Sequence, residues 1–140
     1  MSSITDKERY FIDSNIILYS LDKNEDKQRR ILNLMTNKNA YISTQVLVEV
    51  GNVSRKKFHH SIEQVENIIN RMCDSFSMRI IRLDEKIIKE WFIFQKDFQS
   101  SYRDSFILAA AKVAECSILY SEDMQHGQLI EGIKIVNPFL

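Results

Sequence analysis

The segment CSILYSEDMQHG, residues 116–127, runs an apolar stretch typical of a buried strand into a turn that carries two adjacent acids, Glu122 and Asp123. A second segment of this kind, RYFIDSN at residues 9–15, places Asp13 directly after a β-rich run. A carboxylate near apolar surface costs free energy unless it is paired, hydrogen-bonded or bound to a metal. The two segments therefore predict two strands, each followed by an acid that is a candidate for ligand binding or catalysis.

The rest of the chain alternates strand-like and helix-like segments. Strands are expected at residues 9–12, 40–43, 78–83, 117–121 and 133–136, and helices at about 27–36, 44–57, 62–76, 85–99 and 103–115. Thr44 and Asp84 are the expected N-caps of two of these helices. This alternation predicts an α/β fold, in which helices cover both faces of a central parallel sheet of about five strands.

Composition limits the architecture and the function. The 140 residues, 44% of them hydrophobic, suffice for one compact core, so we expect a single domain over residues 1–140. The 19 basic and 19 acidic residues balance, so any binding of nucleic acid must come from local patches. Cys73 and Cys116 have no metal-ligand spacing and are expected to be reduced thiols in the core.

Nothing in the sequence predicts a membrane protein. The N-terminal segment MSSITDKERYFIDSN is charged, and the longest apolar run, FILAAA at residues 106–111, is far shorter than a membrane span. We therefore expect a cytoplasmic location.

Four acids are the candidates for a functional cluster. Asp13 and Asp123 follow strands, where open α/β sheets bind their ligands. Glu49 lies within the apolar STQVLVEVGNV and Asp104 opens RDSFILAAAKVAEC. Three of them have a simpler interpretation: Asp13 as a helix cap, Glu49 on the polar face of a helix, Asp104 favoured by the helix dipole. If all four converge, their mutual repulsion requires divalent cations, and oxygen ligands suit Mg²⁺ or Mn²⁺.

The segments YFIDSNIILYSL, YISTQVLVEVGNV and YRDSFILAAAKVAECSILYSEDMQHGQLIEGIKIVNPF resemble, in this order, a PIN-domain protein of the VapC-type ribonuclease toxins of type II toxin–antitoxin pairs. The likeness extends from Tyr10 to Phe139, and it implies a PIN-like α/β/α sandwich. It assigns the catalytic and metal-binding acids to Asp13, Glu49, Asp104 and Asp123, and accessory polar roles to Asn15 and Ser121. One departure is Arg103, which stands where the family frequently has a bulkier apolar or aromatic residue.

The resemblance implies a metal-dependent endoribonuclease. Mg²⁺ or Mn²⁺ held by the four carboxylates would activate the water that hydrolyses an RNA phosphodiester. The expected partners are RNA, a cognate antitoxin protein and a second copy of the chain in a homodimer. Arg55, Lys56 and Lys57 are candidates for RNA binding, although basic residues at a helix end also complement the helix dipole.

Other classes of function remain open at this stage. A dinucleotide-binding domain is disfavoured because the only glycines, Gly51, Gly127 and Gly132, are too scattered for a phosphate-binding loop. A phosphotransfer enzyme would use Asp13 as a covalent nucleophile. A binding module without catalysis would use the acids only as caps and surface groups.

Overall fold

The computed structural model describes residues 8–140, so the first seven residues of the charged N-terminal segment discussed above lie outside the described residues. A six-stranded sheet forms its centre, in the order β3-β2-β1-β4-β6-β5. The strands are β1 (Tyr10–Ile12), β2 (Ala40–Ser43), β3 (Arg79–Ile81), β4 (Ile118–Tyr120), β5 (Leu129–Ile130) and β6 (Ile133–Val136). All pairs are parallel except β5 with β6.

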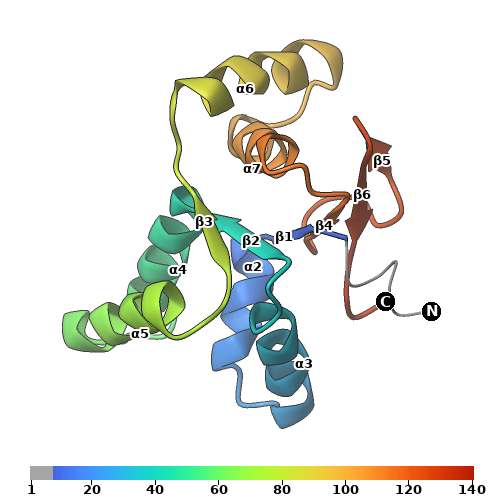
Figure 1. Ribbon diagram of the computed structural model, residues 1–140. Coiled ribbons are helices and arrows are strands. Elements are labelled where there is room, and N and C mark those ends of the chain that lie inside the picture. Colours follow the sequence, from blue (N-terminus) through green and yellow to red (C-terminus); the bar gives the residue numbers. More distant parts are fainter. Residues whose placement is uncertain (1–7) are drawn as a thin grey trace.

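Helices cover the sheet on both sides. They are α2 (Ser14–Ile17), the 3₁₀ turn η1 (Leu18–Leu21), α3 (Glu25–Met35), α4 (Thr44–Lys56), α5 (Ile62–Asp74), α6 (Glu85–Asp97) and α7 (Tyr102–Val113). Figure 1 shows α6 and α7 on one side of the sheet and α2 to α5 on the other. The α/β/α sandwich predicted from the sequence is therefore confirmed. No helix among residues 8–140 is long and apolar enough to cross a membrane.

The chain order reverses at the middle of the sheet. From β1 the chain moves outward to β2 and β3, and it then returns to place β4 on the other side of β1. Phe11 of β1 pairs with Tyr41 of β2 and with Leu119 of β4. The carboxyl ends of β1 and β4 flank this switch point, which is the place where open α/β sheets bind their ligands.

The core explains why these two strands are held firmly. All three residues of β1 are buried, as expected for a central strand covered on both faces. Ala109, Ala110 and Ala111 of α7 are also fully buried, so this helix is apolar nearly all round and lies between α6 and the sheet. Asp13 and Ser121 therefore project from rigid elements.

Three short elements, α2, η1 and β5, were not predicted. The helical turns over Ser14–Leu21 are too short to show a helical period in the sequence. β5 has two residues and joins β6 through Glu131 and Gly132, which both have positive φ values (49° and 80°), as a tight two-residue hairpin turn requires.

Three further expectations can be compared with the structure. Asp84 caps α6, as predicted, by accepting a hydrogen bond from Ile87 N. Thr44 is not a cap, because Ser43 fills that position and accepts from Val46 N.

Cys73 is exposed on α5, so the prediction of two core thiols was wrong for this residue. Cys116 is buried, and its burial raises the pKa of the thiol to about 12.

Candidate active site

Asp13 lies at the carboxyl end of β1 with a fully buried side chain. It is the N-cap of α2, since Oδ1 accepts a hydrogen bond from Ser14 N at 2.7 Å. Ser121 Oγ, at the end of β4, donates to Asp13 Oδ2 at 2.9 Å. Burial raises the pKa of the Asp13 carboxyl, while hydrogen bonds from Arg103, Ser121 and Ser14 oppose this shift. Asp13 thus combines the capping role and the strand-end position considered from the sequence.

Glu49 reaches the same place from α4. Its Oε1 accepts a hydrogen bond from Ser14 Oγ at 2.7 Å, and its Oε2 accepts from Gln45 Nε2 at 3.3 Å. About a quarter of its side chain is exposed (24%), so it lies at the inner edge of the helix surface rather than on the outer polar face. The helix that begins after β2 therefore carries a carboxylate to the end of β1.

Arg103 joins three of the four candidate acids. This residue lies in the first turn of α7, and its guanidinium forms ion pairs with Asp13, with Glu49 at 2.7 Å and with Asp104 at 2.9 Å. Its Nε also donates to Glu49 Oε2 at 2.8 Å. Three carboxylates from three different elements thus surround one positive group.

Asp104 follows Arg103 directly and lies in the first turn of α7, where an acid is favoured by the helix dipole. The cap of this helix is Ser101, whose Oγ accepts from Asp104 N at 3.0 Å. The Asp104 carboxylate instead accepts from Arg103 Nη1. Asp104 is therefore both an acid favoured by the helix dipole and a member of the cluster around Arg103.

Asp123 is placed differently. It lines the same cleft as Glu49 and Arg103, and its backbone N–H donates to Ser121 Oγ at 3.3 Å. Within residues 8–140, no hydrogen bond or ion pair joins its carboxylate to the other three acids or to Arg103. The structure therefore brings three predicted acids together and leaves the fourth at the rim.

The two accessory residues lie beside Asp13. Asn15 Nδ2 approaches Asp13 Oδ2 at 3.5 Å, and its Oδ1 accepts from Glu122 N at 3.4 Å. Ser121 holds both Asp13 and the backbone of Asp123. Glu122 itself accepts a hydrogen bond from Tyr19 Oη at 2.9 Å, so it belongs to the cleft wall.

The donor set has the chemistry of a hard-cation site. Carboxylate oxygens are the preferred ligands of Mg²⁺ and Mn²⁺, and here three carboxylates already face one positive group. With the guanidinium among them, no set of three or more His, Cys, Asp or Glu side chains in the described residues is spaced to hold a metal ion. The carboxylates are therefore of the type that binds a divalent cation, but the Arg103 guanidinium lies between them.

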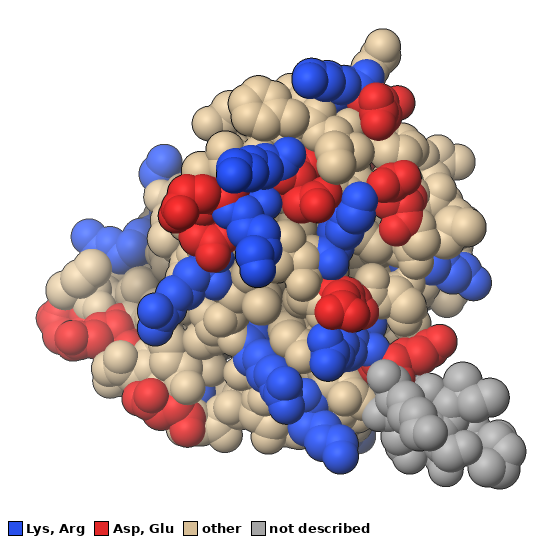
Figure 2. Space-filling view, turned by 45° about the horizontal axis from the view of Figure 1, so that its top comes forward, with Lys and Arg blue, Asp and Glu red and all other residues tan. Residues whose placement is uncertain are grey.

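The cleft outside the cluster has a volume of about 610 Å³. Its wall includes Tyr19 and Glu122 on one side and Lys57 and Phe58 beyond the end of α4. Of the three candidate RNA-binding residues, only Lys57 lines it. Arg55 donates to His60 O at 3.3 Å, and Lys56 is exposed in the last turn of α4. Figure 2 shows basic and acidic side chains interleaved over the face that it presents.

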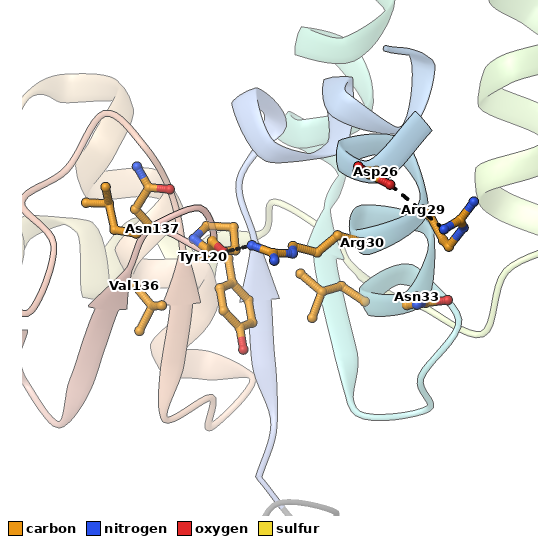
Figure 3. Close-up of a pocket in the computed structure, with 10 residues that line it drawn as sticks. Asp26, Arg29, Arg30, Asn33, Tyr120, Val136 and Asn137 are labelled. Carbon is orange, nitrogen blue, oxygen red and sulfur yellow. Dashed lines mark hydrogen bonds and ion pairs between the residues drawn. The ribbon is translucent and has the colours of Figure 1, made fainter. Parts of the chain in front are cut away.

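A larger hollow of about 730 Å³ lies apart from the four acids, between α3 and the ends of β4 and β6. Figure 3 shows Arg30 extending from α3 toward Tyr120 of β4, and Val136 and Asn33 also line this hollow. Arg30 Nη1 donates to Pro138 O at 2.8 Å, and Arg29 pairs with Asp26. Its two arginines are thus engaged with the protein itself.

Reasoning from the sequence did not place Arg103, Ser14 or Gln45 at the site. Arg103 was noted only as a departure beside Asp104, although a basic residue next to an acid at the start of an apolar helix is a usable signal. Ser14 links two of the acids, since its Oγ donates to Glu49 Oε1 at 2.7 Å and its backbone N–H donates to Asp13 Oδ1 at 2.7 Å. Its role depends on a contact with α4 that the sequence does not show.

The sequence matches the PIN domain family over residues 10–129, and the chain belongs to this family. Its fold is similar to a toxin–antitoxin complex from Klebsiella pneumoniae (TM-score 0.68, 19% identity, covering 92% of this chain and 97% of that one). It is also similar to VapBC2 from Rickettsia felis bound to a promoter DNA fragment (TM-score 0.67, 21% identity, 90% and 96% covered). No match to a curated protein sequence reaches significance.

A third similar structure is Mycobacterium tuberculosis VapC20, described as a sarcin–ricin loop cleaving toxin (TM-score 0.61, 13% identity, 81% and 89% covered). At these identities the structures establish the fold. The PIN-domain resemblance found in the sequence is confirmed by the family match, and VapC-type toxins are among the proteins that share the fold.

Proposed function

We propose that the chain is a metal-dependent endoribonuclease and the toxin of a type II toxin–antitoxin pair. The observation that carries this proposal is the convergence of Asp13, Glu49 and Asp104 around one positive charge at the switch point of the sheet. Membership of the PIN domain family supports it, as does the fold shared with a toxin described as cleaving the sarcin–ricin loop.

The four acids would hold one or two Mg²⁺ or Mn²⁺ ions. Such ions, when bound, supply an activated water and neutralise charge on a scissile phosphate. Asp13, Glu49 and Asp104 provide the inner carboxylates and Asp123 a fourth at the rim of the cleft. Ser121 and Asn15 orient Asp13 through its Oδ2, which is the kind of support that fixes a metal ligand in place.

The cleft would receive the RNA. Lys57 lines it, and Arg55 and Lys56 lie in the last turn of the same helix, so this end of α4 would contact phosphates. An antitoxin and a second copy of the chain are the proposed protein partners, by analogy with the toxin–antitoxin complexes that share the fold.

The test compares RNA cleavage by the wild type, Asp13→Asn and Asp74→Asn, each with Mg²⁺, Mn²⁺ or EDTA. Asp74 is exposed at the end of α5, so Asp74→Asn removes the same charge away from the site. We expect discrete fragments from the wild type and Asp74→Asn that disappear in EDTA, and a loss of about 100-fold or more in Asp13→Asn. Cleavage that persists in EDTA would contradict the proposal.

A phosphotransfer enzyme with Asp13 as nucleophile is less well supported. The Asp13 side chain is fully buried, and both of its oxygens are engaged by neighbouring groups. A phosphoryl donor therefore has no open approach to it while Arg103 contacts this carboxylate. Recovery of an acyl-phosphate on Asp13 after incubation with a phosphoryl donor would favour this alternative over the nuclease.

A further inference from the structure

We propose that Arg103 is an internal competitor for the divalent cation: its guanidinium holds the carboxylates together in the metal-free protein and has to leave them when a metal binds. This inference rests on the proposed function, because it concerns the same site. It goes beyond that function because it makes Arg103 a determinant of the free metal concentration at which the site is occupied.

The contacts of Arg103 cover the inner surface of the cluster. Nη2 contacts Asp13 Oδ1 and lies 2.7 Å from Glu49 Oε1, Nε is 2.8 Å from Glu49 Oε2, and Nη1 is 2.9 Å from Asp104 Oδ1. Nη1 also approaches Asp13 Oδ2 at 3.4 Å. Every nitrogen of the guanidinium therefore points at an oxygen that a metal ion in this cluster would need.

A metal ion and this guanidinium exclude each other on two grounds. The first is steric, since Mg²⁺ binds oxygens at about 2.0–2.1 Å and would stand among atoms that now contact nitrogen. The second is electrostatic, since a positive group a few ångströms from a divalent ion repels it even at the high effective dielectric of a protein surface. Occupation by one therefore lowers the affinity for the other.

The Arg103 side chain has a way out of the cluster, towards the cleft. Arg103 belongs to the first turn of α7, and 32% of its side chain is exposed towards the cleft that it helps to line. Release therefore requires rotation about its side-chain bonds, with no change in the backbone of the helix. Asp22 and Glu122 also line this cleft and provide carboxylates outside the cluster that can accept the displaced guanidinium.

The same geometry predicts a second property of the metal-free protein. Asp13 is fully buried, and the Arg103 guanidinium is the positive group that its carboxylate contacts within residues 8–140. Removing the charge of Arg103 leaves three neighbouring carboxylates without a counter-ion, which is strongly destabilising for a buried charge. A bound metal restores the counter-ion. Loss of Arg103 should therefore make the stability of the protein depend on metal.

The experiment measures Mn²⁺ binding by isothermal titration calorimetry and thermal melting with and without Mn²⁺, in the absence of RNA. The variants are Arg103→Leu, which keeps the bulk and removes the charge, and Arg103→Lys, which keeps the charge but loses the planar fork. Arg82→Leu is the matched control, because Arg82 is exposed just beyond β3.

We expect Arg103→Leu to bind Mn²⁺ about tenfold more tightly than the wild type, or more, with Arg103→Lys between them and Arg82→Leu unchanged. The metal-free Arg103→Leu protein should melt at a lower temperature and gain more from Mn²⁺ than the wild type does. If Arg103→Leu fails to fold without metal, Arg103→Lys still reports the direction of the change in affinity.

Unchanged or weaker Mn²⁺ binding in both Arg103 variants would overturn the inference and leave the metal-dependent nuclease intact. Absence of Mn²⁺ binding from the wild type and from both variants would instead remove the metal site itself, and the proposed function with it. Titration of Asp13→Asn separates these cases from binding elsewhere on the protein, because Mn²⁺ bound at the cluster must be weakened by this change.

Discussion

Ser121 shows how a small side chain can support a buried carboxylate. Its side chain is fully buried at the end of β4, and its hydroxyl donates to Asp13 Oδ2 at 2.9 Å. It also accepts from the backbone N–H of Asp123. One hydroxyl thus couples two of the four acids.

We expect Ser121→Ala to lower Mn²⁺ affinity and RNA cleavage by about 10-fold to 100-fold, because residues that orient a metal ligand contribute this much. Ser117→Ala is the matched control: Ser117 lies just before β4, and its buried hydroxyl has no hydrogen-bond partner among residues 8–140. Calorimetry and a cleavage assay measure the two effects. Equal losses in the two variants would show that Ser121 acts on packing alone.

At the scale of elements, β1 is held against α3 by a hydrogen bond that crosses the layers. Tyr10 Oη donates to Leu34 O at 2.6 Å, and the residue is only 8% exposed. Burial, with a smaller contribution from Tyr120, raises the pKa of Tyr10 to about 12. Since β1 also carries Asp13 at its end, this contact helps to fix the position of the site.

Tyr10→Phe should lower the free energy of unfolding by about 1–3 kcal/mol at pH 7, because the Leu34 carbonyl loses its donor in a part-buried place. The folded-state pKa is raised, so the contribution of the neutral tyrosine is complete below pH 10 and is lost as the pH rises through about 12. The difference between wild type and Tyr10→Phe should therefore shrink across this range. Urea unfolding at several pH values measures it.

Tyr102→Phe provides the control for this prediction, because Tyr102 is 70% exposed. It should change the free energy of unfolding by less than about 0.5 kcal/mol. A Tyr10→Phe protein as stable as this control would show that the hydrogen bond to Leu34 contributes nothing net.

At the scale of the whole molecule, charge is balanced overall and RNA binding has to be local. We expect Arg55→Ala with Lys56→Ala to weaken RNA binding at low salt and to reduce its salt dependence, with Mn²⁺ binding unchanged. The double variant Lys86→Ala, Lys89→Ala is the control, since these exposed lysines lie on α6 across the sheet from α4. Unchanged RNA affinity at low salt in the first variant would exclude this helix end as a binding surface.

The proposed homodimer also belongs to this scale. The chain has a mass of 16.5 kDa, so light scattering of the purified protein should give about twice this value. Exposed apolar side chains such as Phe92 on α6 and Ile62 on α5 offer surface for such a contact. A monomer at every working concentration would rule the dimer out.

The sequence by itself determined the elements and the class of fold. Apolar periods and strand-end acids are local features, so the five main strands and five main helices were predicted close to their observed bounds. The same local pattern selected Asp13, Glu49, Asp104 and Asp123, because an acid beside apolar residues requires a partner in the folded chain. Elements of two to four residues, such as β5 and α2, carry too little pattern to be found in this way.

Only the tertiary structure decided which groups meet. Asp13 and Arg103 are 90 positions apart, and their contact exists because α7 packs across the sheet with its first turn at the carboxyl end of β1. The position of Arg103 at the centre of the acids, the link through Ser14 and the place of Asp123 at the rim all depend on side-chain directions set by packing. Sequence spacing contains no such information, because ion pairing and burial depend on which side chains lie close together in the folded chain.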